Sequence, residues 1–125
     1  MINNGYRVEE VTNNPNFWSK DIDFIVTSPF SGEQKTFEVK FDSKINRTGN
    51  LYLEFLNAHS NNCSGWFEFC KADYLAYGDA VTEEFYVVPM PELRAAVQSM
   101  PKRVAYCGND SAGYLVPLTA IADIT

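Results

Sequence analysis

The chain has 125 residues, a formal net charge of −6 and hydrophobic residues at 46% of its positions. This length suits one domain, residues 1–125, with a single hydrophobic core, and the acidic balance argues against a general nucleic-acid binder, since such domains are usually basic. No apolar run is long enough for a transmembrane helix, and the N-terminus lacks the basic and apolar regions of a signal peptide, so we expect a cytoplasmic protein without a membrane partner.

Alternating apolar residues and turn signals predict a chain rich in strands with one late helix. We expect strands, in order, at residues 6–11, 21–28, 35–42, 51–56, 74–77, 85–88, 103–107 and 114–118. Residues 29–33 predict a hairpin turn, 43–50 a polar loop and 66–74 a short helix or turn. Residues 91–100 predict a helix, because Pro91 suits a first turn and Pro101 follows the last. The expected fold class is α+β with a mixed central sheet.

Charged residues alternate with apolar ones in two neighbouring strands. The period of two places Glu38 and Lys40 on one face of their strand, and Asp21 and Asp23 on one face of the strand before it. Carboxylates brought together would repel one another, whereas Mg²⁺ is held by one or two carboxylates plus substrate phosphates. The pattern therefore predicts metal-assisted phosphodiester cleavage, although an ordinary hairpin with Asp and Lys paired across its strands has the same spacing.

The order Asp23, a spacer, then Glu38-Val39-Lys40 resembles the PD-(D/E)XK nuclease superfamily, which has the restriction-endonuclease-like fold. Segments 21–26, 36–42 and 48–55 are similar to small phage-type members near the Holliday-junction-resolvase-like branch, and segments 71–77 and 91–94 fit their later strand and helix. The resemblance covers residues 5–118. Members usually have a helix before the first strand, and this sequence predicts no such N-terminal helix.

The resemblance implies a Mg²⁺-dependent (or Mn²⁺-dependent) DNA endonuclease, phage-derived, that hydrolyses phosphodiesters with metal-activated water in a bacterial or phage-infected cell. Asp23 and Glu38 would be catalytic metal ligands, with the backbone carbonyl of Val39 as a further ligand. Lys40 would orient the attacking water, help to deprotonate it, or stabilise charge that develops on the phosphate. DNA is the implied partner, and a homodimer stays open because resolvase-like members often pair.

Two further carboxylates are auxiliary candidates. Asp21 faces the same way as Asp23, so either residue can be the main ligand, although the apolar run after Asp23 fits the family pattern more closely. Glu54 would reach the site if its strand lies beside the strand of Glu38. A surface carboxylate at the end of a strand is the ordinary alternative for Glu54.

The polar loop after the Glu38 strand contains four candidate DNA contacts, Lys44, Arg47, Thr48 and Asn50. Their side chains can bond phosphate oxygens, and the glycine among them lets the backbone approach a phosphate closely. A solvated turn has the same composition, so the contact remains an expectation.

Other chemistry is weakly indicated. His59, Cys63, Cys70 and Cys107 are irregularly spaced, which predicts neither a zinc site nor a disulfide framework. Two alternatives to the nuclease stay open: a catalytically inactive member of the same fold that binds DNA or a protein, and an acidic inhibitor that mimics DNA. The complete set of Asp23, Glu38 and Lys40 favours the enzyme over both.

Overall fold

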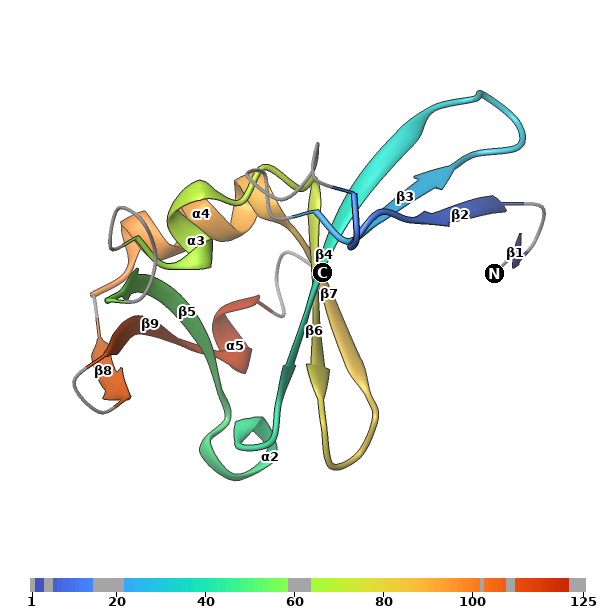
Figure 1. The fold of residues 1–125 in the computed structure, drawn as a ribbon. Coiled ribbons are helices and arrows are strands. Elements are labelled where there is room, and N and C mark those ends of the chain that lie inside the picture. Colours follow the sequence, from blue (N-terminus) through green and yellow to red (C-terminus); the bar gives the residue numbers. More distant parts are fainter. Residues whose placement is uncertain are drawn as a thin grey trace.

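Two β-sheets and a few short helices make up the fold (Figure 1). The computed structural model describes residues 2–3, 6–14, 22–58, 64–101, 103–107 and 110–121. The larger sheet has six strands in the order β1-β2-β3-β4-β6-β7, and the smaller has three in the order β5-β9-β8. The expected α+β class is confirmed, whereas the expected single central sheet is replaced by two sheets.

The larger sheet is mixed. Its strands are β1 (Ile2–Asn3), β2 (Tyr6–Glu10), β3 (Phe24–Thr27), β4 (Gln34–Asp42), β6 (Tyr74–Asp79) and β7 (Phe85–Pro89). The pair β4 and β6 is parallel, and every other neighbouring pair is antiparallel. The hairpin turn predicted at residues 29–33 is confirmed between β3 and β4, and β6 and β7 form a second hairpin. The second hairpin turns at Ala80–Thr82.

The smaller sheet consists of β5 (Asn50–Asn57), β8 (Val104–Cys107) and β9 (Ser111–Pro117). Strand β5 pairs with β9 and not with β4, so the strand of Glu54 does not adjoin the strand of Glu38. Before β5, the expected polar loop forms one helical turn, α2 (Ile45–Thr48), with Ile45 buried. Gly49 ends this turn at φ 69° and donates its N–H to the carbonyl of Ile45. A left-handed residue at this position favours glycine.

Helices lie between and beside the sheets. They are α3 (Trp66–Phe69), α4 (Met90–Ser99) and α5 (Leu118–Ile121). The predicted helix 91–100 is confirmed as α4, shifted by one residue, and its buried Leu93 and Val97 are four apart, on one face. Both sheets contribute to one core, for example through Leu53 of β5 and Leu75 of β6.

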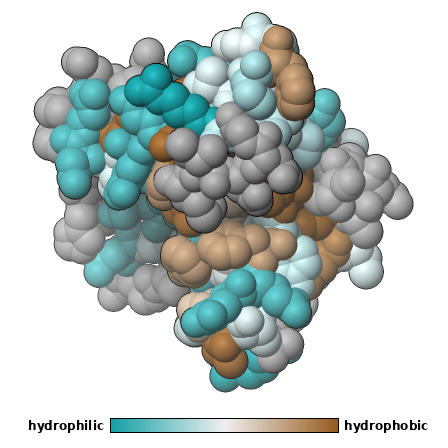
Figure 2. All heavy atoms as spheres, turned by 90° about the vertical axis from the view of Figure 1, so that its right-hand side faces the viewer, coloured by the Kyte–Doolittle hydropathy of each residue, from teal (hydrophilic) through white to brown (hydrophobic). Residues whose placement is uncertain are grey.

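The outer face of the larger sheet is apolar at its β4, β6 and β7 strands. Phe41 and Phe85 pack edge to face with ring centroids 5.2 Å apart, and both are exposed. Figure 2 views the side of the molecule turned away from the smaller sheet, where hydrophobic residues form a band between hydrophilic ones. Among the described helices, none is long and apolar enough to cross a membrane.

Candidate active site

Asp23 contacts β4 at the residue that follows Glu38. Its Oδ2 accepts a hydrogen bond of 2.9 Å from the backbone N–H of Val39. Its own N–H donates to the carbonyl of Phe37, whereas its carbonyl accepts from the N–H of Val11 on the opposite side. A residue within a regular strand directs both groups to one side. The strand predicted for residues 21–28 therefore begins only at Phe24. At Val39, the carboxylate of Asp23 accepts the hydrogen bond that a backbone carbonyl of β3 would accept in a regular ladder.

The carbonyl of Val39 points to the edge of β4 where Asp23 lies. Phe37 directs its carbonyl toward Asp23, and Val39, two residues later, faces the same side. Pairing between β3 and β4 ends at Phe24 and Phe37, so no residue of β3 is in register with Val39. The N–H of Val39 and the carboxylate of Asp23 therefore meet at this edge, and the carbonyl of Val39 faces the same side.

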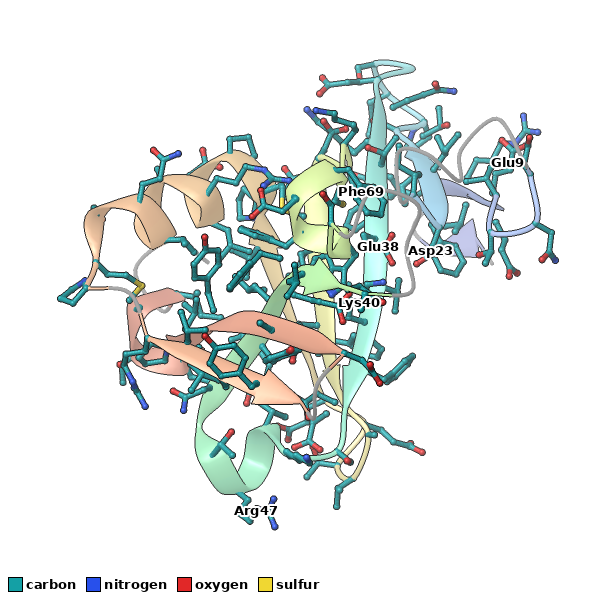
Figure 3. All side chains as sticks on the ribbon, turned by 60° about the vertical axis from the view of Figure 1, so that its left-hand side comes forward. Glu9, Asp23, Glu38, Lys40, Arg47 and Phe69 are labelled. Carbon is teal, nitrogen blue, oxygen red and sulfur yellow. The ribbon has the colours of Figure 1, made fainter. Side chains whose placement is uncertain are left out.

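Glu38 and Lys40 lie on the same face of β4, as their spacing predicts. Lys40 Nζ is 3.2 Å from Glu38 Oε1. Glu38 is 2% exposed, whereas the side chain of Lys40 is 29% exposed. The ammonium also lies 5.0 Å from the ring centroid of Trp66 in α3, a cation–π contact that holds the lysine from its other side. Figure 3 shows Asp23, Glu38 and Lys40 in one part of the molecule along β4.

Lys40 lines a pocket of about 520 Å³ that lies between the two sheets. Three of the four predicted DNA contacts, Lys44, Thr48 and Asn50, line it. The fourth, Arg47, does not line the pocket, and Figure 3 shows it pointing outward from α2. The structure therefore joins the predicted catalytic lysine to most of the predicted contact residues, which α2 brings to the end of β4.

Asp42 and Tyr77 form a second polar pair in this pocket that the sequence does not predict. The hydroxyl of Tyr77 donates to Asp42 Oδ2 at 2.6 Å and accepts from the N–H of Tyr52 at 3.0 Å. The N–H of Lys44 donates to Asp42 Oδ1 at 2.7 Å. Burial, and then the hydrogen bond to Asp42, raise the pKa of Tyr77 well above its ordinary value of 10.0. Tyr77 therefore stays neutral and ties β6 to the start of β5.

Of the two auxiliary acids, the structure describes Glu54, which is not brought to this site. Asp21 lies outside the described residues. Glu54 accepts hydrogen bonds from Ser111 Oγ at 2.8 Å and Asn57 Nδ2 at 3.3 Å, within and beside the smaller sheet. The adjacency to β4 that its predicted role requires is absent, because the turn of α2 sends β5 to β9.

Of the four zinc candidates, the structure describes the side chain of Cys70 alone. Cys70 is buried in the core at the end of α3. His59 and Cys63 lie outside the described residues, as does the side chain of Cys107. Within residues whose positions are described, no three His, Cys, Asp or Glu side chains are grouped closely enough to hold a metal ion.

The donors at Val39 nevertheless fit Mg²⁺. The ion typically takes one or two protein carboxylates and completes its shell with water and phosphate oxygens. Two carboxylates are held near one stretch of β4: Asp23 by its hydrogen bond from the N–H of Val39, and Glu38 by its ion pair with Lys40. Comparison of the chain with protein-family models, with curated proteins and with solved structures finds no match.

Proposed function

We propose that this protein is a Mg²⁺-dependent DNA endonuclease, with Mn²⁺ as a substitute metal. One observation carries the proposal: the carboxylate of Asp23 accepts a hydrogen bond from the N–H of Val39. The two neighbours of Val39 in β4, Glu38 and Lys40, form an ion pair with each other. Two acids, a carbonyl and a cation are thereby grouped around three consecutive residues of one strand. These are the groups that metal-assisted phosphodiester hydrolysis requires.

The metal would be held by the carboxylates of Asp23 and Glu38 and by the carbonyl of Val39, all hard oxygen donors. When bound, it supplies charge stabilisation at the phosphoryl oxygens and a more acidic water. The burial of Glu38 keeps competing water away from that carboxylate. Asp23 is less buried than Glu38, so a metal held by these two carboxylates would be accessible to a phosphate from solvent on the side of Asp23.

Lys40 would act on the substrate and not on the metal held by Asp23, Glu38 and Val39. Its contact with Trp66 and its ion pair with Glu38 hold the ammonium beside the pocket that Lys40 lines. A cation positioned before reaction stabilises developing negative charge on phosphate without later reorganisation. Lys44, Thr48 and Asn50 extend the contact surface along the same pocket, where backbone phosphates can be bound.

A non-catalytic DNA-binding protein is the second candidate, and one observation favours it. The pocket combines Lys40 with three further contact residues that need no metal to bind DNA. In that case the ion pair of Lys40 with Glu38 would be a structural feature of β4. The two candidates differ in whether a divalent ion binds at Asp23 and Glu38.

The decisive experiment combines a cleavage assay with a metal titration. Supercoiled, linear and branched DNA are incubated with the protein and Mg²⁺ or Mn²⁺, with EDTA as the control. Calorimetric titration of Mn²⁺ into wild type and Glu38→Gln reports binding separately from cleavage. Metal-dependent cleavage that Glu38→Gln abolishes supports the endonuclease. Wild type that cleaves none of these substrates and binds no metal overturns it.

Further parts of the proposal follow from the same reaction. A DNA endonuclease of this kind works where the DNA is, in the cytoplasm of a bacterial or phage-infected cell. A homodimer would place two such sites on one branched substrate. Analytical ultracentrifugation with and without branched DNA measures the stoichiometry.

A further inference from the structure

The pocket between the sheets is larger than the contact of one lysine with one phosphate requires. Its volume of about 520 Å³ lies in the range of sites that enclose a small organic ligand. Residues from both sheets line it, among them Lys40 and Tyr77 from the larger sheet and Tyr52, Tyr106 and Leu115 from the smaller. A ligand in this pocket therefore touches both layers of the fold.

Two lysines line the pocket in an otherwise acidic protein. They are Lys40 and Lys44, and Asp42 is the one carboxylate among the described lining residues, in a chain of net charge −6. Both oxygens of Asp42 already accept hydrogen bonds, from the N–H of Lys44 and the hydroxyl of Tyr77. Lys44 is exposed and makes no ion pair with any described residue. A ligand with negative charge near Lys44 fits this surface.

The remaining lining suits an aromatic ring with polar edges. The hydroxyls of Tyr52 and Tyr77 are hydrogen-bonded to Ser111 and Asp42, so these residues offer mainly ring surface. Tyr106 lines the pocket while 75% exposed. The side-chain amide of Asn50 makes no hydrogen bond to the described part of the chain, and an amide of this kind pairs with the edge of a base.

We propose that this pocket holds an unpaired nucleotide of a DNA strand, with its base against Tyr106 and its phosphate at Lys44. The choice of DNA rests on the proposed function; the need for an unpaired base rests on the pocket alone. Bases inside a duplex stack on their neighbours and do not present a face to an aromatic side chain, whereas single strands stack readily on such platforms. The preferred substrate is therefore DNA with a single-stranded segment beside the scissile phosphate.

The test measures binding in EDTA, so that it does not depend on metal or cleavage. Fluorescence anisotropy compares a single-stranded oligonucleotide, a blunt duplex and the same duplex with a single-stranded flap. Tighter binding of the two DNAs that contain unpaired bases, by about tenfold, supports the proposal, because stacking of one base is typically worth that much. Equal affinity for the blunt duplex, or no binding of single-stranded DNA, overturns it.

Variants locate the binding to the pocket. Tyr106→Ala should weaken single-strand binding by about tenfold, and Tyr106→Phe, which keeps the ring, should not. Phe30→Ala is the matched control, since Phe30 is 88% exposed in the turn between β3 and β4. Lys44→Ala should lower the dependence of log affinity on log salt by about one.

An unchanged affinity in Tyr106→Ala would overturn the pocket as the binding site. Single-strand binding in EDTA together with absent cleavage in Mg²⁺ and Mn²⁺ would support the pocket and refute the endonuclease. Cleavage of blunt duplex alone would support the endonuclease and refute the pocket as a site for an unpaired base. The two proposals therefore fail separately.

Discussion

Lys40 Nζ lies 3.2 Å from Oε1 of Glu38, and Glu38 is the more deeply buried partner. This pair links the fold to the proposed chemistry, because the lysine that would stabilise charge on phosphate also neutralises a carboxylate inside the protein. From sequence alone, the loss of Lys40 is expected to leave folding largely intact. The structure changes that expectation, since removing one member of a buried ion pair is costly.

Lys40→Ala should therefore impair both cleavage and stability. We expect a fall in cleavage rate of roughly 10²–10³, the typical effect of losing a donor that stabilises transition-state charge. The free energy of unfolding should also fall by about 1–3 kcal/mol, because a buried carboxylate loses a charged hydrogen-bond donor. Cleavage kinetics at saturating Mg²⁺ and urea denaturation measure the two effects.

A double variant separates them. Glu38→Gln combined with Lys40→Met removes both charges and should recover part of the stability lost in Lys40→Met alone, because the pair costs least when both members are absent. Cleavage should stay lost. Full cleavage by Lys40→Ala would remove this lysine from the mechanism.

Asp23 offers a similar separation through its hydrogen bond to Val39. Asp23→Asn keeps a side-chain oxygen for the Val39 N–H, so its free energy of unfolding should stay close to that of wild type. Asp23→Ala leaves that N–H without this acceptor and should lose about 1–3 kcal/mol. Both variants should bind Mn²⁺ more weakly in calorimetric titration, since both lack the carboxylate. Undiminished Mn²⁺ affinity in Asp23→Asn would show that this residue is structural only.

Sequence reasoning finds the strands and the helix whose signals are local. Strand β4 carries strict alternation from Phe37 to Phe41, and α4 has Pro91 in its first turn, so both are predicted nearly at their observed bounds. The face shared by Glu38 and Lys40 follows from the same alternation. These features depend on neighbours within one element.

Sequence reasoning misses what depends on distant residues. Ile45 and Gly49 are the two local signs of α2. The sequence predicts a loop there, because a single helical turn is too short a segment to show the helical repeat of apolar residues. Because α2 redirects the chain after β4, β5 pairs with β9 in the second sheet and not with β4. Tyr77 and Asp42 are 35 residues apart, so no spacing predicts their hydrogen bond.

Gly65 holds α3 against β5 and should not tolerate a side chain. A Cβ at this position would overlap the backbone carbonyl of Glu54, which cannot rotate away as a side chain can. Gly65→Ala should lower the free energy of unfolding by about 1–3 kcal/mol, the usual cost of overpacking. Because Trp66 follows directly and contacts Lys40, cleavage should fall as well.

The exposed Glu68, within α3, provides the control for the substitution at the N-cap residue Gly65. Glu68→Ala should stay within about 0.5 kcal/mol of wild type, as exposed positions usually do. Thermal denaturation of the two variants side by side measures the difference. Equal stability of Gly65→Ala and wild type would mean that α3 can move away from β5 at little cost.

Tyr77 should make stability sensitive to alkaline pH. Burial and the hydrogen bond to Asp42 raise its pKa in the folded protein above the ordinary value of 10.0. Above that value the unfolded chain releases the phenol proton while the folded protein retains it. The unfolded state then binds fewer protons, so the free energy of unfolding falls as pH rises. The stabilising contribution is complete below the ordinary tyrosine pKa and is lost progressively above it.

Tyr77→Phe tests this contribution directly. At neutral pH the variant should lose about 1–3 kcal/mol, because Asp42 Oδ2 and the N–H of Tyr52 lose their shared partner. Its free energy of unfolding should then fall less steeply than that of wild type as pH rises past 10.0, the ordinary pKa of tyrosine. Urea denaturation at a series of alkaline pH values gives both slopes. Parallel slopes would assign the alkaline loss of stability to other tyrosines and would leave the Tyr77–Asp42 pair with a packing role alone.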